Sequence, residues 1–251
     1  MSTRSLRWLA YGRWQLLDYL WQRLALPFVL ASLVCVAAFA TTHEAMSRGE
    51  PFWTAADSAR FSAMVLKQAM GTFIPLAVLM AMNGVVALDR QKGYFRFFFS
   101  KPVPVTGFYV SAFVIHLAFA TAAAGALAAA IGQYSSPQPI LGTALACVLT
   151  FILLGSLMFL LSTLTYQDGI VFIAVWVGTL LMRQIEPALG AGHWLHTAVR
   201  FLPPTHRLDA VRDALYTAQP YQVNDVWHVL AYGAACFALA VIALRKLPLA
   251  R

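Results

Sequence analysis

The residues that could do chemistry are concentrated in one short charged and aromatic segment. Residues 89–105 read DRQKGYFRFFFSKPVPV, so acidic and basic side chains are interleaved with phenylalanines. The segment is too charged to lie in hydrocarbon. It is also too aromatic to lie free in water, because burying one large apolar side chain gains about 1.5 to 3 kcal/mol. We therefore predict that it packs against the rest of the chain, a membrane interface or a partner protein.

The spacing inside this segment indicates a short helix. Lys92 and Arg96 are four residues apart, so they could project from one side of that helix toward a groove that carries carboxylates. Gly93 allows a sharp exit from the preceding helix, and Pro102 ends the short helix. The alternative interpretation is a well-packed loop with no partner.

Three other polar residues stand in or beside apolar stretches: Lys67, Asn83 and His116. A polar or ionisable side chain inside a membrane is costly, so these residues are candidates for a translocation pathway. Lys67 and His116 could equally extend toward the membrane surface, where their polar ends stay hydrated.

We predict no metal site and no catalytic residue. Cys35, Cys147 and Cys236 lie in three different apolar segments without CxxC spacing. His193 and His196 are two ligands where a zinc site normally has three or four protein ligands. In addition, no acidic residue lies in the middle of an apolar stretch, which argues against carboxylate-dependent catalysis and proton relays.

The elements that must position these residues are membrane helices. The chain is 60% hydrophobic and 11% charged, whereas a soluble domain has roughly 25% charged residues. A membrane-spanning helix needs about 20 mostly apolar residues. We predict an all-α, polytopic membrane protein that forms a single domain over residues 1–251, with six spans at residues 24–41, 70–88, 108–133, 140–165, 169–182 and 226–244.

The charges predict the orientation of these spans. If residues 1–23 are cytoplasmic, eleven of the 18 Lys and Arg residues fall inside with only three of the 10 Asp and Glu residues, so the net charge of +8 lies on one side. This is the positive-inside pattern, and it places both termini in the cytoplasm. Because the topology accounts for the basic residues, we predict no nucleic-acid binding.

Two segments outside the spans have amphipathic patterns. Residues 1–23 interleave arginines with Trp and Tyr, which is typical of a helix lying at the membrane interface. Residues 183–225 form an external loop in which Pro203 and Pro204 precede a predicted amphipathic helix that Thr205 could cap.

The charged segment resembles the coupling helix of type-2 ABC exporter permeases. The resemblance lies in an acidic residue, a basic residue, two variable positions and glycine, then a short apolar helix and a basic residue followed by Pro and Val, all after the second of six spans. These positions are Asp89, Arg90, Gly93, Lys101, Pro102 and Val103. The chain departs from the family pattern at Asp89, where Glu is commoner, and at Tyr94, where Thr is commoner.

The resemblance implies the transmembrane subunit of an exporter in the inner (cytoplasmic) membrane, with no catalytic activity of its own. No Gly-Lys pair occurs in the chain, so it lacks the GxxxxGK[ST] phosphate loop, and ATP and Mg would bind to a separate cassette ATPase subunit. The resemblance further implies a second permease copy or a homologous permease, and an extracytoplasmic partner could dock on the external loop. The implied contacts with the ATPase are Asp89, Arg90, Lys92, Gly93, Phe95, Arg96, Lys101 and Pro102. A secondary carrier that does not use ATP and an assembly scaffold remain the alternatives.

Overall fold

The computed structural model describes residues 13, 17, 23–47, 55–91, 105–134, 139–185, 199 and 201–246. Most residues in these ranges are helical and none is in a strand, which confirms the predicted all-α class. Most of the predicted interface helix and all of residues 92–104 lie outside the described ranges.

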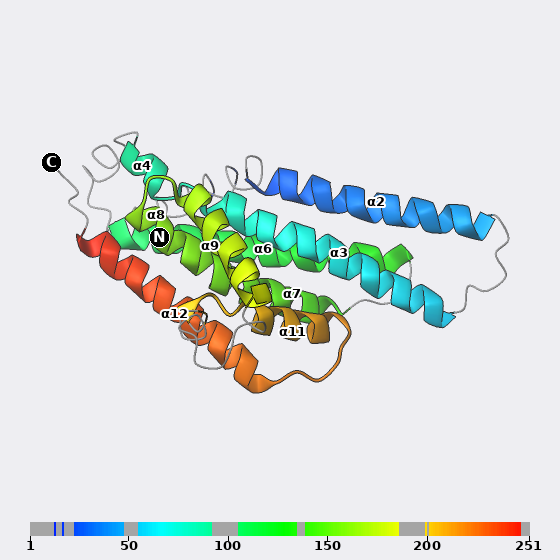
Figure 1. Ribbon diagram of the computed structural model, residues 1–251. Coiled ribbons are helices and arrows are strands. Elements are labelled where there is room, and N and C mark those ends of the chain that lie inside the picture. Colours follow the sequence, from blue (N-terminus) through cyan, green and yellow to red (C-terminus); the bar gives the residue numbers. More distant parts are fainter. Residues whose placement is uncertain are drawn as a thin grey trace, which may run out of the picture.

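The long helices lie roughly along one another in a bundle (Figure 1). Among the described residues, five stretches are long and apolar enough to cross a membrane, at Arg60–Gln91, Val105–Gln133, Ile140–Leu164, Asp168–Ile185 and Val223–Lys246. They are formed by α3 (Ala55–Met82) with α4 (Ala87–Gln91), by α6 (Val105–Tyr134), by α7 (Ile140–Thr150) with η2 (Phe151–Gly155) and α8 (Ser156–Leu164), by α9 (Asp168–Ile185), and by α12 (Val223–Lys246). These lengths and compositions indicate a membrane-embedded protein.

The first predicted span corresponds to α2 (Ala25–Ser47), which has a shorter apolar stretch at Ala25–Ala37. It lies along α3, and Arg23 Nη1 donates a hydrogen bond of 2.6 Å to the Ala81 carbonyl at the far end of α3. The start of α2 is therefore beside the end of α3, as expected for antiparallel neighbours.

The bundle has two ends that differ in their short helices (Figure 1). One end, the α4 end, contains the starts of α2, α6 and α9, the ends of α3, α8 and α12, and α4 itself. The other, the α11 end, contains α11 (Thr205–Tyr216) and the opposite termini of the long helices.

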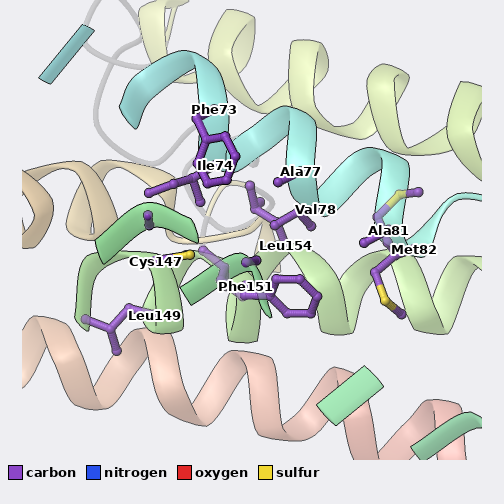
Figure 2. Packing of buried hydrophobic residues seen from close by; sticks show 14 of the residues in the cluster. Phe73, Ile74, Ala77, Val78, Ala81, Met82, Cys147, Leu149, Phe151 and Leu154 are labelled. Atoms are coloured by element: carbon purple, nitrogen blue, oxygen red, sulfur yellow. The ribbon is translucent and has the colours of Figure 1, made fainter. Parts of the chain in front are cut away.

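The core lies where α3 crosses the π-helix η2. Figure 2 shows Phe73, Ile74 and Ala77 of α3 beside Phe151 and Leu154 of η2, all at most 5% exposed. A π-helix places one additional residue in a helical turn, so α8 is rotated relative to α7.

Helix α12 approaches this turn closely because of a glycine. A Cβ added to Gly233 would be 2.6 Å from the carbonyl oxygen of Ile152. Real Cβ atoms do not come that close to a carbonyl oxygen, so a larger residue would push α12 away from the bundle.

The amphipathic helix predicted after the two prolines is present as α11. The prediction that Thr205 caps this helix is wrong. The N-cap position is occupied by Pro204, and no side chain caps the helix there. Leu208, Val211 and Leu215 are buried. Near Leu215, a Cβ on Gly142 of α7 would be 2.4 Å from the Leu215 carbonyl oxygen, so only glycine fits there.

The predicted second span differs from the observed helix at both ends. Helix α3 begins at Ala55 rather than near residue 70, because its first turns are too polar to be recognised as a membrane stretch although they are helical. Its regular structure ends at Met82, and the chain turns at Gly84, before the predicted exit at Gly93.

Candidate functional site

The helix that leads into the charged segment is interrupted at residues 83–86. Gly84 has a φ of +69°, a left-handed conformation that glycine adopts at little cost. A Cβ at this position would also be 2.5 Å from the Leu88 side chain. The turn ends α3 and gives α4 a new direction.

The interruption leaves backbone amides without partners in their own helix, and side chains of two other helices accept their hydrogen bonds. Gly84 N donates to Asp168 Oδ2 at 2.7 Å. Val86 N and Ala87 N both donate to Ser162 Oγ, at 3.0 and 3.1 Å. Since a buried unpaired amide costs about 1 to 3 kcal/mol, these acceptors stabilise the turn.

Asp168 is a buried carboxylate at the start of α9. Its side chain is largely covered, since the residue is 4% exposed. Oδ1 accepts a second hydrogen bond from the Gly169 amide at 3.0 Å, and a carboxylate at a helix N-terminus is favourable in the field of the helix dipole.

Arg90 connects α4 to the turn between α8 and α9. Its Nη1 donates to the Thr163 carbonyl at 2.8 Å and its Nη2 to the Tyr166 hydroxyl at 3.2 Å. The guanidinium also lies over the Tyr166 ring, 4.6 Å from the ring centre. Gln91 Nε2 donates to the Tyr166 carbonyl at 3.1 Å.

Asp89 connects α4 to α6. The Tyr109 hydroxyl donates to Asp89 Oδ2 at 2.9 Å, and Tyr109 is 1% exposed. The described chain ends at Gln91 and resumes at Val105. This hydrogen bond therefore joins the helices on either side of residues 92–104. We call Gly84, Val86, Ala87, Asp89 and Arg90, with their partners Tyr109, Ser162, Tyr166 and Asp168, the α4 site.

A pocket of about 420 Å³ lies beside the α4 site. Its lining includes Asn83, Gly84, Tyr166 and Asp168. Asn83 is exposed and lies against Gly169, where an added Cβ would be 2.8 Å from Asn83 Oδ1. The pocket is therefore bounded by the interrupted helix on one side and by the turn between α8 and α9 on the other.

The three residues predicted for a translocation pathway do not come together. Lys67 and Asn83 are about 24 Å apart along α3, at 1.5 Å per residue. Lys67 forms an ion pair of 2.7 Å with Asp213 at the α11 end, whereas Asn83 lies at the α4 end. Lys67 and Asn83 therefore lie near opposite ends of the bundle. His116 is on α6 and is 6% exposed.

Of the predicted ATPase contacts, Asp89 and Arg90 lie in the α4 site. The other six, Lys92, Gly93, Phe95, Arg96, Lys101 and Pro102, lie outside the described residues.

No group of three His, Cys, Asp or Glu side chains suited to a metal occurs in the part of the chain that the structure describes. The three cysteines are buried and free. His206 contacts Arg183 Nη1 through its Nδ1, and burial together with the Arg183 and Arg207 charges lowers the pKa of His206. His193 and His196 lie outside the described residues.

Sequence reasoning missed most of the partners in the α4 site: Tyr109, Ser162, Tyr166 and Asp168. Ser162 is one of few polar residues inside an apolar stretch, and Tyr166 and Asp168 flank a predicted turn. The residue types were a signal that these positions matter. Their partners lie about 20 to 84 positions away in the chain, and no spacing rule connects them.

Comparison with known proteins gave no relationship: no protein-family model and no curated protein matches this chain.

Proposed function

We propose that this chain is the membrane-spanning permease subunit of an ABC exporter, and that a separate cassette ATPase binds residues 89–105. Movement of that segment, driven by ATP binding and hydrolysis in the partner, would change the arrangement of the spans. ATP and Mg bind to the partner in this proposal, and this chain supplies the conduit.

The observation that carries the proposal is the set of bonds around α4. A force applied to residues 92–104 acts first on α4, which bonds through Arg90 and Gln91 to the turn between α8 and α9. It acts at the same time on α6, through the hydrogen bond between Asp89 and Tyr109. Four membrane helices, α3, α6, α8 and α9, are thus connected to the one segment whose sequence resembles a coupling helix.

The distribution of charge supports a cytoplasmic α4 end. Among the described residues, those at this end include Arg23, Arg90, Arg245 and Lys246, with Asp89 and Asp168 as the acids. The described charges at the α11 end are balanced between cations and acids, so the excess of cations at the α4 end favours that end as the inner side. In this proposal α2 is a sixth span, both termini are in the cytoplasm, and residues 183–225 are extracytoplasmic.

The exposed apolar faces of α2 and α9 fit contact with lipid and with a second permease. Leu33 and Val36 of α2 are 57% and 64% exposed, and Ile170 of α9 is 67% exposed. We propose that two copies of this chain, or this chain and a homologous permease, frame the pathway in the inner membrane.

The test is purification of the tagged chain with its native co-expressed proteins, followed by assay of vanadate-sensitive ATP hydrolysis. We expect a cassette ATPase to co-purify. The variants Arg96→Glu and Gly93→Leu should lose the ATPase or uncouple its activity, because they change the charge and the backbone of the contacting segment. Arg60→Glu, a charge reversal on α3 toward the α11 end, is the matched control and should retain the partner.

If no ATPase accompanies the chain under gentle extraction, the proposal fails. Transport that depends on a proton gradient would then identify a secondary carrier, and the absence of such transport would favour an assembly scaffold.

A further inference from the structure

A second pocket lies between α3 and α11, at the opposite end of the bundle from the α4 site. Its volume is about 500 Å³, within the roughly 300–1,000 Å³ of small-molecule sites. Ala63 and Met64 of α3 form one apolar wall, and Ala210 and Ala214 of α11 form the other. We call it the α11 pocket.

The charged groups at the α11 pocket are balanced. Lys67 and Asp213 line it and form an ion pair of 2.7 Å between Nζ and Oδ2, with side chains 59% and 47% exposed. On the same helix, Arg212 Nη2 pairs with Asp209 Oδ1 at 3.1 Å. A ligand with a single charge would leave one member of the lining pair without its counter-ion, whereas a zwitterion would satisfy both.

Opening the lining pair costs little. An exposed ion pair contributes about 0 to 1 kcal/mol, because water screens both charges. A ligand that presents an anion to Lys67 and a cation to Asp213 replaces one pair by two, and the apolar walls add burial for its hydrocarbon part.

We propose that the α11 pocket binds the headgroup of a zwitterionic lipid with a primary ammonium, as in an aminophospholipid. Asp213 binds the ammonium and Lys67 binds the phosphate. The acyl chains leave along the bundle surface past Met64, which is 60% exposed. The site does not depend on the proposed ATP-driven transport.

The proposal is tested by native mass spectrometry of the full chain in detergent with added phosphatidylethanolamine, phosphatidylglycerol or phosphatidylcholine. We expect phosphatidylethanolamine to bind up to about fivefold more tightly than the other two, since a charge pair with these exposed side chains is partly screened by water. Phosphatidylglycerol has no cation for Asp213. The quaternary ammonium of phosphatidylcholine has no N–H group to donate.

Single variants should abolish the preference. Lys67→Gln and Asp213→Asn each remove one charge, and we expect either to weaken phosphatidylethanolamine binding up to about fivefold. Exchange of the two charges, Lys67→Asp with Asp213→Lys, keeps an ion pair and should keep the preference. Arg60→Gln, which removes a cation from the same helix outside the pocket lining, is the control and should bind like the wild type.

Three results would overturn the proposal. Tighter binding of phosphatidylglycerol would identify a simple anion site, and equal binding of all three lipids would indicate non-specific annular lipid. Soluble phosphoethanolamine binding as tightly as the intact lipid would show that the ligand is not a membrane lipid. Thermal unfolding of each variant without added lipid separates a lost site from a lost fold.

Discussion

Ser162 holds the interrupted helix because one hydroxyl oxygen accepts hydrogen bonds from two buried amides, those of Val86 and Ala87. Ser162→Ala leaves both amides without an acceptor, and we predict a loss of about 1 to 3 kcal/mol of stability. Thermal unfolding in detergent measures it as a lower midpoint. Thr150→Val is the control, because it removes only a bond to Ala146 in its own helix. Equal midpoints for the two variants would contradict this role of Ser162.

We predict that His206 contributes to the acid sensitivity of the α11 end. Burial and the Arg183 and Arg207 guanidiniums lower its pKa below the ordinary 6.5, although Asp225 and Asp209 act in the opposite direction. The unfolded chain therefore takes up the proton first as the pH falls. The contribution of His206 to stability is complete above pH 6.5 and is lost as the pH falls through the lowered pKa.

The measurement is the unfolding midpoint at about pH 7.5 and at about pH 5.5. We predict a smaller acid-induced decrease for His206→Gln than for the wild type, because the variant has no proton to take up. An identical decrease in both proteins would show that other groups cause the acid sensitivity.

The junction between α3 and α4 depends on the left-handed glycine. Gly84→Ala places a Cβ in a conformation that costs an L-residue roughly 1 to 2 kcal/mol, and 2.5 Å from Leu88. We predict a lower unfolding midpoint and weaker coupling of any partner ATPase. Gly71→Ala is the matched control, since nothing lies within 4 Å of its Cβ in α3, and it should stabilise the helix by up to about 1 kcal/mol.

A double variant separates the two causes. Adding Leu88→Ala to Gly84→Ala removes the steric contact but not the backbone strain, so we expect partial recovery of the midpoint. Full recovery would mean that the left-handed conformation contributes little. No recovery would assign the whole effect to the backbone.

At the element scale, the sequence predicts helices well and their interruptions poorly. The apolar stretches at 140–165, 169–182 and 226–244 correspond closely to observed helices, because burial in lipid requires a continuous apolar run. The π-helix at Phe151–Gly155 lies inside the first of these stretches and leaves no mark on its composition. The break at Gly84 was also missed, although Asn83 and Gly84 form an Asn-Gly pair, which is a turn signal. The acceptors of its amides come from other helices and were not predictable.

At the scale of the whole molecule, the sequence predicts a segment that could contact a partner, but it does not predict the contacts of the residues beside that segment. Asp89 and Arg90 are part of a charged motif that is evident in the sequence. Their contacts with Tyr109 and Tyr166 arise because the starts of α6 and α9 meet the end of α3 at one end of the bundle. This contact between helix ends depends on how the helices pack, and it cannot be predicted from composition or residue spacing.

The orientation of the molecule gives the broadest prediction, and the native cysteines make it testable. Cys35, Cys147 and Cys236 are buried, so a membrane-impermeant thiol reagent should leave the wild-type chain unlabelled. Gln167 at the α4 end and Gln219 at the α11 end are exposed. We predict that Gln219→Cys is labelled in intact cells and that Gln167→Cys is labelled only after the membrane is made permeable.

The reverse labelling pattern would place the α4 end outside the cell. A cytoplasmic ATPase could not reach residues 89–105 in that orientation, and the proposed transport function would fail. The lipid site would then face the cytoplasm, but its ion pair and apolar walls would be unchanged. The labelling experiment therefore tests the proposed function, and lipid binding tests the α11 pocket independently.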